Sequence, residues 1–346
     1  MEHKVPCFLY IKYLDDEICT CTCIIYIYMS NILEIKKLNL GFNTEEGFRQ
    51  ALFDVSLNIK EGEMHALVGE SGCGKSMTAM SIIKLLPKTA SITGGEIFFK
   101  GKDLLKLDAK RIREVRGAHI ALIPQDPMTS LNPLYTVGNQ LLEIIKLHQN
   151  LRGKDAKKKA LEALDMVQIP SAKERFNQYP HEFSGGMKQR AIIAMALACN
   201  AELIIADEPT TALDVTIQAQ IMRLLADIKK EYSTSILLIT HDLALVSENA
   251  DEVSVMYAGR IVENAPTEEF FSNTNHPYSI GLIKSIPSGK EQKLTVIKGH
   301  PPSIMDNIEG CRFHNRCKFC IPNLCDKKVP DLKHLNRTHL SACFLN

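Results

Sequence analysis

The sequence predicts an α/β protein built around a parallel β-sheet. The first observation is an apolar run at residues 64–68 that leads directly into a glycine-rich loop at residues 69–76 and then into a helical pattern. The second is the segment LIIADE at residues 203–208, in which an apolar strand ends in two carboxylates. The third is the alternation of strand-like and helix-like segments from residue 201 onward. Such alternation is typical of a parallel sheet with crossover helices.

The loop at residues 69–76 fits the phosphate-binding pattern G-x-x-x-x-G-K-[ST]. Glycines let backbone N–H groups surround an anion, and Lys75 adds a point charge for the β- and γ-phosphates of a nucleotide. The Ser76 hydroxyl can ligate Mg²⁺. We expect a helix over residues 76–86, stopped by Pro87, whose positive dipole end faces the anion. The predicted nucleotide-binding residues of this loop are Gly69, Glu70, Ser71, Gly72, Cys73, Gly74, Lys75 and Ser76.

The two carboxylates at the end of the LIIADE strand have separate predicted roles. Successive strand residues point in opposite directions, so Asp207 and Glu208 cannot do the same job while the strand continues. We expect Asp207 to help hold Mg²⁺ and Glu208 to polarise an attacking water.

The composition limits the classes of function. The chain has 346 residues and a net charge of +1, from 41 basic and 40 acidic residues, so net charge indicates no polyelectrolyte-binding surface. We therefore expect no nucleic-acid partner. No run reaches the roughly 18 apolar residues that a membrane helix needs, and the longest candidate, at residues 18–29, is too short. If the protein works at a membrane, another chain spans it.

The chain divides into three predicted parts. Residues 1–28 resemble nothing that follows, and we hypothesise that translation starts at Met29. Residues 29–271 form the main domain, with antiparallel strands over residues 32–59 and a helical insertion at about residues 126–190. Residues 272–346 form a C-terminal extension that is rich in cysteine.

The segment SGGMKQR at residues 184–190 resembles the signature motif of the ATP-binding cassette (ABC) family, and the resemblance covers roughly residues 31–275. Serine and glycine at a helix start make a second anion site. The resemblance implies that Ser184, Gly185 and Gly186 face the γ-phosphate held by the other subunit of a dimer. It also implies a phosphate-loop ATPase fold with a RecA-like core, an antiparallel β layer and a helical subdomain.

Further motifs of the family follow in the expected order. Gln125 in IPQDP resembles the glutamine that senses Mg²⁺ and water, and Asp214 in ALD resembles the loop that crosses the dimer seam. His241 in LLITHD resembles the histidine that bonds the γ-phosphate and positions the water of Glu208. For the aromatic residue that stacks on adenine we choose Phe42, with Phe48 as the alternative. The implied catalytic residues are Glu208, His241 and Gln125, and the implied Mg²⁺ ligands are Ser76, Gln125 and Asp207.

The cysteines of the extension predict a local site. Five of the 11 cysteines follow residue 310, and nucleotide chemistry places the chain in the cytosol, where thiols bind metal more often than they form disulfides. Spacing alone favours structural zinc on four thiolates, with reduced, metal-free cysteines as a further alternative. The cysteines concerned are Cys311, Cys317, Cys320, Cys325 and Cys343.

The segments HPYSIGLIKSIP, KGHPPS and GCRFHNRC resemble the C-terminal extension of oligopeptide, dipeptide and nickel importer ATPases. This resemblance implies a 4Fe–4S cluster on Cys311, Cys317, Cys325 and Cys343, and leaves open whether Cys320 or Cys325 is the ligand.

The combined expectation is an ATPase subunit at the cytoplasmic face of the membrane that energises peptide uptake. The implied partners are a second ATPase, more often a paralogue than an identical copy, two membrane permease subunits and an extracellular solute-binding protein. One alternative is uptake of nickel or another metal chelate. A soluble ABC ATPase acting on nucleic acid or the ribosome is the alternative from another class. The spacing of about 110 residues between Lys75 and Ser184 argues against that class, because its chromosome-structuring members have long coiled coils there.

Overall fold

The computed structural model describes residues 30–211, 213–286 and 297–346. The hypothesis about Met29 and residues 1–28, and Ala212 of the ALD motif, lie outside these residues. Within them the strands form an eight-stranded sheet of order β11-β12-β10-β9-β3-β8-β7-β6 and a four-stranded sheet of order β2-β1-β4-β5. No helix in the described ranges has both the length and the apolar character that a bilayer crossing requires.

The centre of the large sheet confirms the predicted parallel arrangement. Five neighbouring strands run parallel, and in the three innermost of them every residue is buried. Burial on both faces explains why these segments are continuous apolar runs. The parallel strands are β3 Met64–Val68, β6 Ile120–Ile123, β7 Leu203–Asp207, β8 Ser235–Thr240 and β9 Glu252–Tyr257.

The small sheet is antiparallel, as expected for its first two strands. Its third strand was missed in the sequence because SITGGEIFF lacks regular alternation: Gly95 has φ +96, and a Cβ there would lie 2.5 Å from the carbonyl of Lys37. The strands are β1 Asn31–Thr44, β2 Gly47–Lys60, β4 Ala90–Phe99 and β5 Lys102–Asp103.

Helix α1, Lys75–Ile82, is shorter than the predicted helix over residues 76–86. Lys84 has φ +52, a left-handed conformation that cannot continue an α-helix, so the helix ends before Pro87 acts as a stop. The helix begins at Lys75, one residue before the predicted start, and follows Gly74 of the glycine-rich loop.

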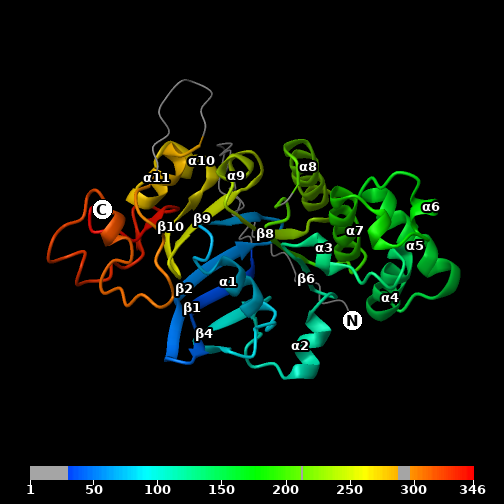
Figure 1. Cartoon of the computed structure of the whole chain (residues 1–346), viewed down its shortest axis with the longest axis horizontal. Coiled ribbons are helices and arrows are strands. Elements are labelled where there is room, and N and C mark those ends of the chain that lie inside the picture. Colours follow the sequence, from blue (N-terminus) through cyan, green and yellow to red (C-terminus); the bar gives the residue numbers. More distant parts are fainter. Residues whose placement is uncertain (1–29, 212, 287–296) are drawn as a thin grey trace, which may run out of the picture.

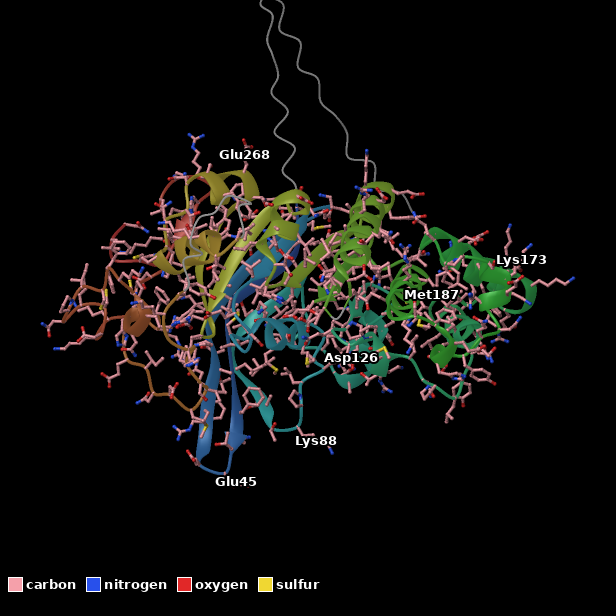
Figure 2. All side chains as sticks on the ribbon, turned by 45° about the horizontal axis from the view of Figure 1, so that its top comes forward. Glu45, Lys88, Asp126, Lys173, Met187 and Glu268 are labelled. Atoms are coloured by element: carbon pink, nitrogen blue, oxygen red, sulfur yellow. The ribbon has the colours of Figure 1, made fainter. Side chains whose placement is uncertain are left out.

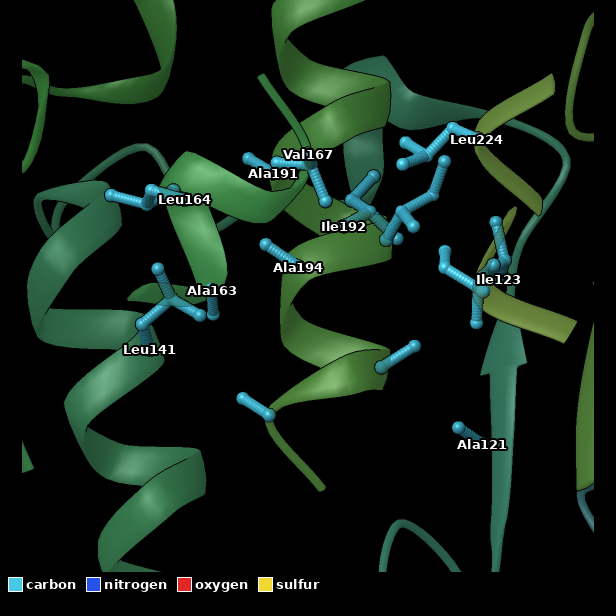
Figure 3. Close-up of a cluster of buried hydrophobic side chains, with 14 of the residues drawn as sticks. Ala121, Ile123, Leu141, Ala163, Leu164, Val167, Ala191, Ile192, Ala194 and Leu224 are labelled. Carbon is cyan, nitrogen blue, oxygen red and sulfur yellow. The ribbon is translucent and has the colours of Figure 1, made fainter. Parts of the chain in front are cut away.

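The helical insertion is continuous with the core of the large sheet. Figure 3 shows α7 between two groups of side chains, with Leu141 and Leu164 on one side and Ile123 and Leu224 on the other. All four are buried apolar side chains. The insertion contains α3 Pro127–Ser130, α4 Val137–Gln149, α5 Gly153–Met166, α6 Ala172–Arg175, η1 Pro180–Glu182 and α7 Gly185–Leu197.

The remaining helices of the main domain connect the strands. They are α2 Ala109–Val115, α8 Val215–Tyr232 and α9 Leu243–Asn249, and their N-caps are Asp108, Asp214 and Asp242. Each Asp side chain accepts a backbone N–H of the first turn, which is why these helices begin where they do.

The C-terminal extension extends the large sheet, at the end of the molecule opposite α4–α6 (Figure 1). β12 pairs with β10 in antiparallel fashion. The fully buried carboxylate of Glu263 accepts the N–H of Asn275 at 2.7 Å and contacts His339 Nε2 at 2.8 Å, which ties both ends of the extension to β10. The main domain ends with β10 Arg260–Pro266 and α10 Thr267–Ser272. The extension contains α11 Pro277–Lys284, η2 His314–Arg316, β11 Lys333–His334 and β12 Leu340–Ser341.

Candidate nucleotide-binding site

The glycine-rich loop turns between β3 and α1 and packs closely against neighbouring segments at two of its glycines. A Cβ on Gly69 would lie 2.2 Å from the carbonyl oxygen of Met256, and a Cβ on Gly74 would lie 2.6 Å from Leu52. Gly74, at φ +111, is also the left-handed N-cap of α1. The loop therefore requires glycine at these positions and leaves backbone N–H groups at a helix start for an anion.

Lys75 is turned back on its own loop. Its ammonium donates to the carbonyls of Gly69 at 2.8 Å and Glu70 at 3.0 Å, and only 4% of the residue is exposed. Carbonyls are weak partners for a buried cation compared with an anion. The ammonium is therefore suited to exchange these bonds for phosphate oxygens.

Ser76 and Asp207 meet across the end of the sheet. The Ser76 hydroxyl donates to Asp207 Oδ1 at 3.0 Å. Burial raises the pKa of Asp207, and the charge of Glu208 adds to this, while Ser76 and Lys75 act in the opposite direction. A hydroxyl beside a desolvated carboxylate is a donor set that a hard divalent cation would stabilise.

Glu208 lies just beyond β7, so strand alternation does not set its direction. Its φ of +47 turns the chain, whereas the sequence reasoning assumed a continuing strand. Its Oε2 accepts the Gln125 amide at 3.1 Å and the Thr211 hydroxyl at 2.8 Å, and lies 3.5 Å from His241 Nδ1. The structure thus brings the three expected catalytic residues together. Thr211 was missed, although a hydroxyl three residues after Glu208 was a usable signal.

A cavity of about 440 Å³ adjoins the loop, and residues from distant segments line it. Phe42 lies on its wall, while the alternative Phe48 is not among the lining residues and is 46% exposed. The extension adds part of the wall, which sequence reasoning did not anticipate. A larger cavity of about 720 Å³ lies elsewhere and contains none of the motif residues. The lining includes Ser71, Gly72, Gly74, Lys75, Ser76, Gln125, Glu208, Pro302, Ser303, Ile304 and Arg312.

The second predicted anion site lies outside this cavity. Ser184 is exposed and caps α7, with its Oγ accepting the Met187 N–H at 3.3 Å. A Cβ on Gly186 would lie 3.0 Å from Ile217 of α8, the helix capped by Asp214. In Figure 2 Met187 lies between the central sheet and the far helical end of the molecule.

The cysteines of the extension gather loosely. Burial raises the pKa of Cys311 to about 11, and the neighbouring thiols of Cys325, Cys343 and Cys317 add to it. Cys325 is buried and influences the pKa of each of the other three, whereas Cys320 influences only Cys317 among them. No three of these thiols, all in the described part of the chain, have sulfur atoms within 4.8 Å of one another.

Family models match two parts of the chain. Residues 52–211 match the model described as ABC transporter, and residues 262–325 match the one described as oligopeptide/dipeptide transporter, C-terminal region. Together with the phosphate loop and the assembled Ser76, Asp207 and Glu208, these matches define an ABC-type ATPase, whose reaction is ATP hydrolysis.

Curated relatives match over nearly the whole chain. The chain is 50% identical over 317 residues to a probable peptide ABC transporter ATP-binding protein, y4tR, of Sinorhizobium fredii, with 90% of this chain and 94% of that protein covered. It is 47% identical over 325 residues to the dipeptide transport ATP-binding protein DppD of Bacillus subtilis, with 92% and 95% covered. The chain belongs to the ABC transporter ATPases that carry the oligopeptide/dipeptide transporter C-terminal region.

A solved structure supports the fold. The dimeric, post-hydrolysis ATP-binding cassette MJ0796, bound to ADP and Pi, superposes with a TM-score of 0.62 at 30% identity. The match covers 68% of this chain and 98% of that one.

Proposed function

We propose that this chain is the ATP-hydrolysing subunit that energises the import of oligopeptides or dipeptides. The observation that carries the proposal is the joint presence of an assembled ATPase site and a C-terminal region of the oligopeptide/dipeptide transporter type. The names of the similar proteins from Sinorhizobium and Bacillus support peptides as the solute. They give no support to nickel uptake or to work on nucleic acid.

The phosphate loop, from Gly69 to Ser76, would hold ATP. The glycine cradle and the carbonyl-bound Lys75 fit a triphosphate, and Phe42 would stack on adenine. Ser76, Asp207 and Gln125 would hold Mg²⁺, which when bound supplies charge neutralisation for the phosphates. Glu208 would take a proton from the attacking water, while His241 orients that water and bonds the γ-phosphate.

A second cassette would complete the site. The exposure of Ser184, and its separation from the cavity, support a role on the nucleotide of a partner subunit. Gly185, Gly186 and Asp214 would contribute to the same seam. The dimeric form of the MJ0796 cassette supports this arrangement. A paralogous ATPase is the partner we propose, as the resemblance to the importer ATPases implies. One chain supplies only half of each composite site.

Closure of the pair would drive a membrane partner. Gln125 follows β6 and precedes α3, so it connects the nucleotide site with the helical insertion. We propose that this insertion contacts a permease subunit at the cytoplasmic face of the membrane. The assembly would contain two permease subunits, and an extracellular protein would deliver the solute. ATP would bind more tightly to the closed pair of cassettes than to the open pair, and so would favour closure. The permease would respond to this difference in ATP affinity between the two states.

Cys311, Cys317, Cys325 and Cys343 are proposed to hold a 4Fe–4S cluster. The four thiols lie close enough to influence one another, Cys325 is buried and the other three are partly buried, which fits a shielded four-cysteine site. Cys325 fits better than Cys320 because it lies near all three others. A zinc ion would need sulfur atoms about 3.8 Å apart, as Zn–S bonds of 2.3 Å in a tetrahedron require. The spread of the sulfurs disfavours that geometry. Absorbance near 400 nm after anaerobic purification tests the cluster, and zinc as the sole bound metal would exclude it.

Uptake measurement tests the proposed function. A strain lacking this chain should lose uptake of labelled di- and oligopeptides and regain it when the wild-type gene, but not a Lys75→Ala gene, is returned. Loss of nickel uptake with normal peptide uptake would contradict the proposal, and so would normal uptake of both.

A further inference from the structure

The C-terminal extension reaches the phosphate loop through an ion pair between Arg316 and Glu70. The guanidinium makes two bonds to the carboxylate, Nη1 to Oε2 at 2.6 Å and Nη2 to Oε1 at 2.9 Å. The Arg316 side chain is 6% exposed. A bidentate pair of this kind fixes orientation as well as distance, and its burial protects it from solvent screening. Residues 246 positions apart in the sequence are thereby joined at the nucleotide site.

Glu70 is held at each of its polar groups. Its N–H donates to the hydroxyl oxygen of Tyr278 at 3.0 Å, and its carbonyl accepts the ammonium of Lys75 at 3.0 Å. Its carboxylate is the group taken by Arg316. Two of these three partners, Tyr278 and Arg316, belong to the extension.

Contacts with residues other than Glu70 also hold the Arg316 side chain in place. Its Nε donates to the carbonyl of Lys298 at 3.0 Å, and Nη1 lies 3.3 Å from the hydroxyl of Tyr257. It ends the turn η2, in which the N–H of His314 donates to the carbonyl of Cys311 at 2.9 Å. The guanidinium therefore pays little side-chain entropy when it pairs.

A carboxylate within an anion-binding loop is an electrostatic problem that this pair solves. An unpaired Glu70 would repel phosphate oxygens and compete for the Lys75 ammonium. Glu70 is absent from the residues that line the 440 Å³ cavity in the described structure, although Ser71, Gly72 and Lys75 line it. Its carboxylate thus points to Arg316 and not into the space for the nucleotide.

We infer that Arg316 is a positioning residue for nucleotide binding, which neutralises Glu70 and holds its carboxylate away from the phosphates. The inference rests on the proposed nucleotide site and deepens it. The C-terminal extension then contributes directly to ATP binding by the cassette.

Equilibrium binding of radiolabelled ATP to the full-length chain tests the inference through a double-mutant comparison. Arg316→Met should raise the Kd for ATP roughly tenfold in the wild-type background, a coupling of ordinary size between neighbouring sites. In a Glu70→Gln background the same Arg316→Met change should alter the Kd less than twofold, because no carboxylate is left to neutralise. In the assembled ATPase, Arg316→Met should raise KM far more than it lowers kcat.

The matched control is Arg337→Met, an exposed arginine of the same extension, which should leave the Kd unchanged. An equal loss of ATP affinity in both Glu70 backgrounds would overturn the inference, because it would show a general structural role. An unchanged Kd in Arg316→Met would overturn it as well. In either case, loss of ATP binding in Lys75→Ala would still support the proposed nucleotide site, so the two proposals can fail separately. Should Arg316→Met unfold, Arg316→Lys carries the same comparison with a smaller expected shift.

Discussion

The phosphate loop at residues 69–76 and the segment at residues 184–186 both contain glycine and both lie at a helix start. They differ in how completely each one encloses a site for an anion. The first curls around a buried ammonium and opens on a cavity of about 440 Å³. The second is an ordinary capped helix start at the surface, where Ser184 accepts the Met187 N–H. The phosphate loop has its lysine and its cavity within one chain. The segment at residues 184–186 offers hydrogen-bonding groups, but no cavity surrounds them. The proposed nucleotide site, shared between two chains, would need this division.

Replacing Lys75 should have the largest effect. Lys75→Ala removes the cation of the organised site, and we expect ATP affinity to fall by about 100-fold or more, as for loss of a charge-assisted contact in a buried site. Filter binding with labelled ATP measures the change. ATP binding by the Lys75→Ala protein at wild-type affinity would contradict the view that the phosphate loop is the organised anion site.

Replacing Glu208 should separate binding from chemistry. Glu208→Gln keeps the contacts to Thr211 and Gln125 possible but removes the proton acceptor, so we expect hydrolysis to fall by about 10²–10⁴-fold. ATP binding should persist and a closed dimer should accumulate, which size-exclusion chromatography with ATP detects. Normal turnover by Glu208→Gln would exclude it as the base.

Replacing Ser184 should affect only the half-site at the surface. Ser184→Arg places a bulky side chain at the proposed seam, so hydrolysis by the assembled pair should be lost while ATP affinity of the single chain stays within twofold. Stopped hydrolysis with unchanged Kd is the expected pattern. If the isolated chain at high dilution hydrolysed ATP at its full rate, the idea of a shared site would fail.

A pair of glycine substitutions sharpens the comparison further. Gly74→Ala meets both a left-handed φ and Leu52, so we expect a loss of about 1–3 kcal/mol in the free energy of unfolding. In Gly185→Ala the new Cβ meets only Leu213, at 3.7 Å and thus in ordinary van der Waals contact, so the change should be neutral or stabilising by up to about 1 kcal/mol, since alanine favours a helix. Urea unfolding of both variants measures the difference, and equal destabilisation would contradict it.

The sequence was sufficient where a function depends on residues that are close in the chain. The apolar run before Gly69 placed the phosphate loop between β3 and α1, and LIIAD was correctly predicted as a buried strand. The grouping of Gln125, Glu208 and His241 required the family resemblance, because three separate strand ends leave no local pattern. Arg316 was not found at all. Its partner is 246 residues away, and nothing in a single sequence relates an arginine of the extension to a glutamate of the loop.

A prediction about pH concerns the residues of the extension that support the phosphate loop. His276 caps α11, with its Nδ1 accepting the N–H of Tyr278, the residue whose hydroxyl accepts the N–H of Glu70. Burial lowers the pKa of His276 from 6.5 to about 4. Between pH 6.5 and pH 4, His276 is therefore protonated in the unfolded chain but not in the folded chain. The contribution of His276 to the free energy of unfolding is full above pH 6.5 and declines as the pH falls towards 4.

We expect His276 to account for up to about 3 kcal/mol of the loss of unfolding free energy between pH 6.5 and pH 4, from the linkage of pKa to stability. His276→Asn keeps a side-chain acceptor for the helix cap but cannot titrate, so its unfolding free energy should change less over this range than that of the wild type. His334→Asn, at an exposed histidine of the extension, should follow the wild type. Parallel pH profiles for all three proteins would show that His276 does not titrate in this range.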